Sequence, residues 1–100
     1  MGIVMTNMRL FTMIIDYNGG TYITQATSEN YKVAPVECIR KWDISGIEEI
    51  INENEKINVM EQLKDEKFVP LKGLKNIWCG TAFLRDKLML INLVETSNAT

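Results

Sequence analysis

The chain has 100 residues, 46% hydrophobic and 24% charged, which is the composition of one folded domain and argues against a disordered chain. Its formal net charge of −2 argues against a general nucleic-acid-binding domain, which would be basic. The chain has no histidine, and its two cysteines, Cys38 and Cys79, stand in no metal-binding spacing. The sequence therefore predicts neither a metal site nor a cofactor.

We expect a single domain over residues 1–100, with flexible ends at 1–8 and 96–100. No segment resembles a secretory leader, and the longest apolar run, residues 88–94, is too short to span a bilayer. The sequence therefore predicts a cytoplasmic protein that does not bind a membrane.

Residues 9–27 predict a β-hairpin. Asn18-Gly19 is the strongest short signal for a two-residue type I′ turn, which needs positive φ at both central residues. This loop gathers the apolar side chains on one face, whereas a three-residue loop would segregate them poorly. The expected pairs are Ile15 with Tyr22, Met13 with Thr24 and Phe11 with Ala26 on the apolar face, and Ile14 with Ile23, Thr12 with Gln25 and Asp16 with Thr21 on the mixed face.

The middle of the chain predicts helices. Pro35 suits the first turn of a helix, and apolar residues then recur at helical spacing up to Trp42, which we place in the core. Residues 45–48, Ser-Gly-Ile-Glu, match a capping box and predict a second helical start. The apolar pattern resumes later, so residues 55–66 are predicted as a third helix or a continuation of the second.

Two strands are predicted at the end of the chain, at residues 76–84 and 88–95, joined by a polar turn at 85–87. The second strand is apolar on both faces of its pleat except at Asn92. This pattern is typical of a strand that lies centrally or is covered on both sides. The order ββ-α-α(α)-ββ predicts an α+β fold, an antiparallel four-stranded sheet with helices packed on one face.

The sequence contains few of the residue patterns that are typical of an enzyme. A nucleophile normally needs a base within hydrogen-bond reach, and without histidine only lysine or a carboxylate could serve. Cys38 falls in a helical pattern and Cys79 in a strand pattern, and both are predicted to point inward, where a thiol is unreactive. The sequence predicts a protein that is not an enzyme. A small enzyme that uses carboxylates or a thiolate is the alternative.

The charges are unevenly distributed. Residues 43–66 contain eight acidic and two basic side chains, a net charge of −6, and the remaining residues carry a net charge of +4. Such a stretch is either a solvated helix face or a docking surface for a basic partner, because opposed potentials steer encounter and favour one partner over others. The residues predicted on this basis to bind a partner are Asp43, Glu48, Glu49, Glu53 and Glu55.

A resemblance to a known family rests on three segments: RLFTMIIDYNGGTYITQATS, IRKW and GLKNIWCGTAFLRDKLMLINLVET. The chain resembles small bacterial immunity proteins of contact-dependent inhibition and related polymorphic toxin systems over most of residues 9–96. The resemblance implies a non-enzymatic protein that binds a cognate toxin and blocks its active site or an essential surface. Its motifs are structural, so the acidic residues named above rest on charge alone.

The first half, a hairpin followed by a helix, also resembles type II antitoxins with a partial ribonuclease-H-like fold, although it lacks their proline-glycine-cysteine strand segment. This resemblance implies an alternative, an antitoxin-like or regulatory domain that acts through a sheet edge at the hairpin or the final strand and is compatible with a homodimer. The leading hypothesis is a cytoplasmic immunity protein that meets a basic protein toxin through its acidic helical surface, with no direct contact to nucleic acid.

Overall fold

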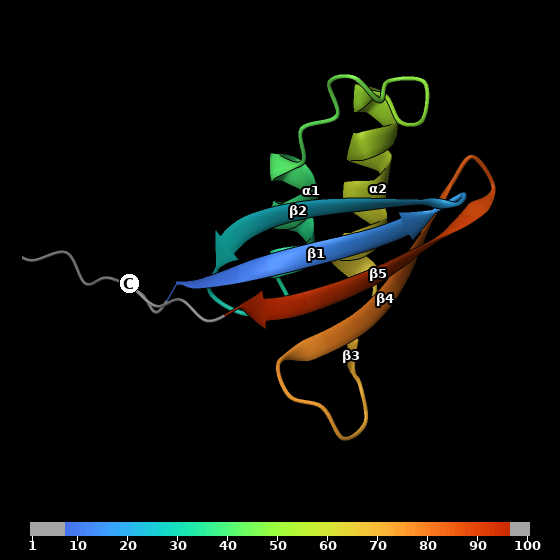
Figure 1. The fold of residues 1–100 in the computed structure, drawn as a ribbon. Helices are drawn as coiled ribbons and strands as arrows, with labels where there is room; N and C mark the ends of the chain where they lie inside the picture. The colour runs from blue at the N-terminus through green and yellow to red at the C-terminus, as the bar shows by residue number, and fades with distance from the viewer. Residues whose placement is uncertain (1–7, 97–100) are drawn as a thin grey trace, which may run out of the picture.

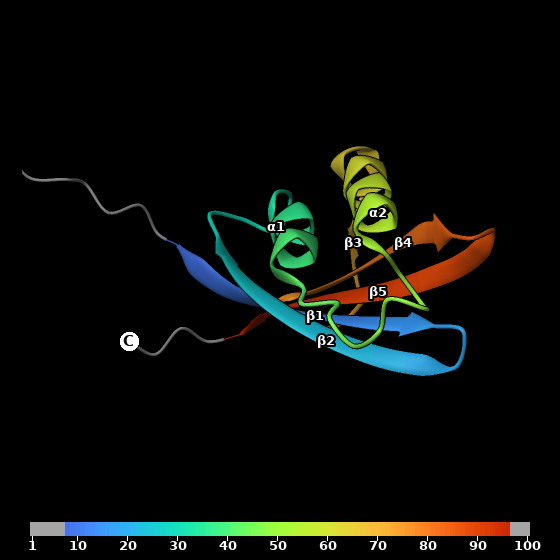
Figure 2. The same cartoon turned by 90° about the horizontal axis from the view of Figure 1, so that it is seen from above.

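The computed structural model describes residues 8–96 of the protein, which form one antiparallel sheet with two helices packed on one of its faces (Figure 1 and Figure 2). The predicted α+β class is confirmed. The elements in chain order are β1 (Arg9–Tyr17), β2 (Gly20–Ser28), α1 (Ala34–Lys41), α2 (Glu53–Asp65), β3 (Val69–Pro70), β4 (Ile77–Leu84) and β5 (Lys87–Thr96). The ends that we expected to be flexible fall mostly on residues 1–7 and 97–100, outside the described part, whereas Thr96 is the last residue of β5.

The β1–β2 hairpin has the register that the sequence predicts. Asn18 and Gly19 form the two-residue turn with φ angles of 50° and 86°, and all six predicted cross-strand pairs are present. One face of β1, including Phe11 and Ile15, is fully buried against the helices. Local turn chemistry and the alternation of side chains therefore determine this part of the fold.

The sheet has five strands, not the predicted four, in the order β2-β1-β5-β4-β3. The additional strand is β3, two residues that pair with the outer side of β4. A strand this short that contains a proline has no recognisable sequence pattern. β5 is central, as its apolar pattern predicted, so the expectation that the final strand could be a sheet edge is wrong.

The turn between β4 and β5 contains two residues, Arg85 and Asp86, where the sequence predicted three. Both residues have positive φ, 53° and 62°, and the closing pair is Leu84 with Lys87. This is the backbone geometry of a type I′ hairpin turn, here formed without the usual asparagine and glycine.

The helical prediction for residues 55–66 agrees with α2, but the predicted start at residues 45–48 is wrong. Those residues form turns, and Gly46 has a φ of 90°, which is outside the helical range. The capping box lies at the start of α2 instead. Glu55 N donates to Asn52 Oδ1 (2.8 Å), and Asn52 N donates to Glu55 Oε1 (3.0 Å).

The core lies between the two helices and the face of the sheet that they cover (Figure 2). Trp42 and Cys38 are buried there, as predicted. Trp78 also faces the helices, and its ring stacks on Tyr31 with a centroid distance of 4.6 Å. Because neighbours in a strand point to opposite faces, Cys79 lies on the other face of the sheet. The prediction that both thiols point inward is therefore wrong for Cys79.

Candidate functional site

All five predicted partner-binding residues lie on one continuous stretch, residues 43–55, which we call the acidic segment. It connects α1 to α2 and includes the first turn of α2. Two apolar side chains, Ile44 and Ile51, are buried, while the carboxylates of the segment are exposed or half-buried. Backbone hydrogen bonds from Ile47 N to Ile44 O and from Ile51 N to Ile47 O close its turns. The segment is therefore held in place by its own apolar residues and presents its acids outward.

The carboxylates of the acidic segment have different surroundings. Asp43 accepts hydrogen bonds from the Ser45 hydroxyl (2.7 Å) and backbone N–H (3.0 Å), and these bonds lower its pKa. Glu48 accepts a bond from the backbone N–H two residues before it (3.0 Å). Glu49 and Glu53 have no side-chain hydrogen bond or ion pair to any residue between 8 and 96. These two carboxylates are the ones most available to a partner.

Glu55 is bound from the sheet side. Arg85, in the β4–β5 turn, donates from Nε to Glu55 Oε2 (2.8 Å) and from Nη2 to Oε1 (2.9 Å), and its Nη1 donates to the Glu49 carbonyl (2.7 Å). This bidentate pair, with the backbone hydrogen bond from Asn52 as the next contribution, lowers the pKa of Glu55 from 4.5 to about 2. Arg85 thereby ties the acidic segment to the tip of the β4–β5 hairpin and neutralises one of its five charges.

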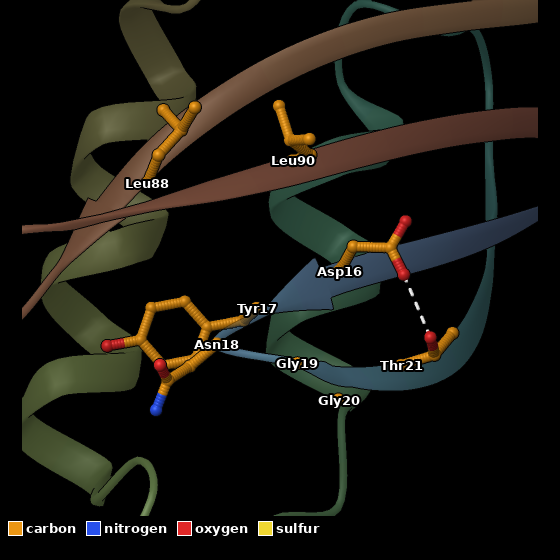
Figure 3. Close-up of a pocket in the computed structure, with 8 residues that line it drawn as sticks. All are labelled: Asp16, Tyr17, Asn18, Gly19, Gly20, Thr21, Leu88 and Leu90. Carbon is orange, nitrogen blue, oxygen red and sulfur yellow. Dashed lines mark hydrogen bonds between the residues drawn. The ribbon is translucent and has the colours of Figure 1, made fainter.

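In the described part of the chain the Cys38 thiol is buried, and the acids form no metal-binding cluster. Burial raises the pKa of the Cys38 thiol to about 12, so this thiol is unreactive near neutral pH. Among residues 8–96 no three His, Cys, Asp or Glu side chains lie together as metal ligands would. A depression of about 360 Å³ lies at the hairpin end of the sheet (Figure 3). Asp16 is the one carboxylate among the residues that line this depression, and it accepts a hydrogen bond from Thr21 (2.8 Å). None of the lining residues is basic.

The sheet face opposite the helices, which we call the open face, is covered by no other element of the described chain (Figure 2). Its alternating positions carry mostly apolar side chains, several of them well exposed: Ile23 is 63%, Phe83 57% and Leu90 44% accessible. The only charged strand residue that points to this face is Asp16. The apolar residues are Leu10, Ile14, Ile23, Val69, Ile77, Cys79, Phe83, Leu88, Leu90 and Val94.

A solvated face of an antiparallel sheet is normally polar, and contiguous apolar patches mark binding surfaces. In the sequence this face was indicated only by β5, where residues 88–94 are apolar at every position except Asn92. Such a strand places apolar side chains on both faces of the sheet. The open face is therefore a second candidate binding surface. It is separate in sequence from the acidic segment.

The two edges of the sheet differ in whether side chains bond the backbone groups that point outward. Along β4, outward backbone groups are bonded by side chains of α2. Glu66 accepts from Thr81 N (2.8 Å), and the Gln62 amide both accepts from Phe83 N and donates to Phe83 O, each at 2.8 Å. These bonds take the place of a neighbouring strand. Gln62 and Glu66 therefore protect this edge from pairing with another chain.

The β2 edge has no such protection in residues 8–96. The two-residue turn sets which β2 residues bond to β1, so the backbone groups of the others point outward. No hydrogen bond from the described chain reaches these outward groups, and β2 contains neither a charged residue nor a proline. The outward residues are Thr21, Ile23, Gln25 and Thr27.

Comparison with known proteins finds no matching family model, curated protein or solved structure. No helix within residues 8–96 is long and apolar enough to cross a membrane. Functional inference therefore rests on the acidic segment, the open face and the β2 edge themselves.

Proposed function

We propose that the protein is a non-enzymatic binding protein of the immunity type, which neutralises a toxin domain by docking its acidic segment on a basic surface of that domain. The observation that carries the proposal is the ordered acidic segment, where five carboxylates stand within thirteen residues that contain no lysine or arginine. A nuclease or another enzyme that binds phosphates has a basic groove, and a surface of opposite potential fits such a groove.

The acidic segment has a fixed conformation, and this supports the proposed function. A loop that must be ordered on binding loses conformational entropy, which weakens affinity. Here the buried Ile44 and Ile51, the capping box and Arg85 already hold the backbone. The free carboxylates of Glu49 and Glu53 can then meet a cationic partner without a large ordering cost.

The experiment is co-expression with the product of the adjacent upstream gene. Under the proposal the two proteins co-purify, and this chain restores growth of cells that express the upstream product. The informative variant is Glu49→Lys with Glu53→Lys, because neither side chain has a partner in the described chain. A lysine in the first turn of α2 should cost no more than about 1 kcal/mol of stability, which a urea midpoint will verify. The affinity of this variant for the toxin should fall roughly tenfold or more, and the affinity of the native chain should fall as salt is raised.

The matched control is Glu29→Lys with Asp65→Lys, two exposed acids outside the acidic segment, at the ends of β2 and α2. This control changes the net charge by the same amount and should retain binding. If the control weakens binding as much as the Glu49 and Glu53 pair, only net charge matters and the acidic segment is not the docking site. If the Glu49 and Glu53 variant binds as the native chain does, the proposal is wrong.

The unprotected β2 edge favours a second candidate, a regulatory or antitoxin-like domain that binds an extended strand of another protein. Thr27→Pro tests it, because a proline at an outward position blocks strand addition without removing a bond within the sheet. Loss of co-purification in this variant, with binding retained by the Glu49 and Glu53 variant, would favour the edge over the acidic segment.

A further inference from the structure

We propose that the open face is a homodimer interface, on which two copies of this chain stack their sheets face to face. Each copy would contribute the face opposite its helices, so the dimer would have two sheets inside and the helices outside. Two twisted antiparallel sheets pack in this way about 10 Å apart, at an angle of about 30°. This inference is independent of the toxin-binding proposal, because no residue of the acidic segment belongs to the strands of the open face.

The chemistry of the face fits an identical partner. Ile14 and Leu90 lie on the adjacent inner strands β1 and β5, where their cross-strand partners are Asn92 and Asp16, and Ile23 and Phe83 extend the apolar positions onto β2 and β4. In a two-fold dimer a patch meets itself, and an apolar patch is complementary to itself whereas a charged patch is not. Asp16 is the only charged residue that the described strands place on this face, and its carboxylate already accepts a hydrogen bond from Thr21.

The size of the face fits a stable dimer. Four strands of eight to ten residues contribute to it. At a spacing of about 4.8 Å between strands and about 3.3 Å per residue, they cover a planar footprint of roughly 500 Å². Two copies would bury roughly 1,000 Å² even before the relief of the side chains is counted, which is about the area that separates biological interfaces from crystal contacts.

The scarcity of charged groups on the open face favours a second copy over a different protein as its partner. A partner-specific surface usually combines an apolar centre with charged or hydrogen-bonding groups that define one orientation. Within the described strands the polar residues of this face are five threonines, Gln25, Asn92 and Asp16, and the other charged residues lie on the helices, in the loops and at strand ends. Such a surface excludes water well but discriminates partners poorly, which suits self-association.

The test is the mass of the purified full chain in solution at micromolar concentration, by light scattering after size exclusion. We expect twice the 11.5 kDa of one chain. Leu90→Lys places a charged side chain on the inner strand β5, opposite Asp16, and should give the mass of one chain, because the dimer would have to desolvate both charges. Leu90 is 44% accessible, so the substitution should leave the monomer folded, which circular dichroism and a urea midpoint will verify. Leu88→Lys, at 46% accessible, is the second variant if Leu90→Lys does not fold.

Two control variants should remain dimeric. Ile57→Lys makes the same kind of change at a 55% accessible position on α2, outside the open face. Thr27→Pro blocks pairing through the β2 edge. A native chain with the mass of one chain overturns the proposal, as does a dimer that survives Leu90→Lys. Dissociation by Thr27→Pro overturns it as well, because the copies would then be joined by their edges.

Thiol alkylation gives an independent readout. Cys79 lies half-buried on the open face, whereas Cys38 is fully buried. N-ethylmaleimide should label Cys79 more slowly in the native dimer than in the Leu90→Lys monomer, and Cys38 should stay unlabelled in both. Equal labelling rates for Cys79 in the two proteins would show that dimerisation does not cover this face.

Discussion

Gly80 is the position where the structure makes its sharpest stability prediction. The residue lies on the core face of β4, and the ring of Phe68, the residue before β3, occupies the space where a side chain at Gly80 would stand. A methyl group at Gly80 would lie 2.6–2.7 Å from three distal atoms of that ring, closer than carbon atoms pack. The arrangement is one in which an aromatic side chain covers a glycine on the neighbouring strand.

Gly80→Ala therefore combines two opposing effects. Alanine restricts the unfolded chain and should stabilise by about 0.5–1 kcal/mol, whereas overpacking against a buried ring costs about 1–3 kcal/mol. The net expectation is a loss of about 1–2 kcal/mol in the free energy of unfolding. For a domain of this size each kcal/mol lowers Tm by about 4–8 °C. Urea unfolding followed by tryptophan fluorescence should show a lower midpoint with an unchanged slope.

The same substitution in a Phe68→Leu background decides whether this reasoning is right. Leucine lacks the three ring atoms that the new methyl group would meet. Phe68→Leu alone should cost about 1–3 kcal/mol because it leaves space in the core. Adding Gly80→Ala should then be neutral or stabilising, so the sign of its effect reverses. If Gly80→Ala is harmless in the native chain, or equally destabilising in both backgrounds, the ring contact does not explain the glycine.

Three further changes test other contacts. Glu55→Gln should reduce the loss of stability that we expect of the native chain on acidification from pH 4.5 to about pH 2, and leave the part that Asp43 contributes. Because the fold lowers the pKa of Glu55, the contribution of its carboxylate to stability is complete above pH 4.5 and disappears as the pH falls through about 2. Urea midpoints measured across this pH range test the prediction. Tyr17→Phe should cost about 1–2 kcal/mol by thermal or urea unfolding, because the buried Leu84 carbonyl loses the hydroxyl that bonds it at 2.6 Å. Gln62→Ala should cost less than about 1 kcal/mol but speed aggregation in light scattering, because the Phe83 backbone is then left open on the β4 edge.

What the sequence could predict depended on local chemistry. The Asn18-Gly19 turn and the alternation in β1 were sufficient for the whole hairpin register, since both act between neighbours in the chain. The capping pattern was less reliable. Residues 45–48 and residues 52–55 both match it, and only the second begins a helix. Glu48 instead bonds the Gly46 N–H within a turn, so the same side chain satisfies a donor without a helix following it.

The features that the sequence did not reveal depend on distant contacts. Counting charges located the acidic segment, but it could not separate Glu55, which Arg85 binds from thirty residues away, from Glu49 and Glu53, whose carboxylates have no partner among residues 8–96. β3 is likewise defined only by its pairing with β4. The open face follows from knowing which strands are neighbours, because only then do apolar residues on β1, β4 and β5 join into one patch.

The two proposed surfaces can be separated experimentally, and this separation is itself a prediction. The acidic segment belongs to the connection between the helices, and the open face belongs to the strands on the other side of the sheet (Figure 1 and Figure 2). Leu90→Lys should therefore yield a monomer that still binds a basic partner, with affinity per chain within about threefold of the native protein. Glu49→Lys with Glu53→Lys should yield a dimer whose affinity for that partner is roughly tenfold lower or more. If the monomeric variant loses partner binding while its urea midpoint is unchanged, the partner and the second copy share the open face. The acidic segment would then have only a structural role, fixed to the sheet by Arg85.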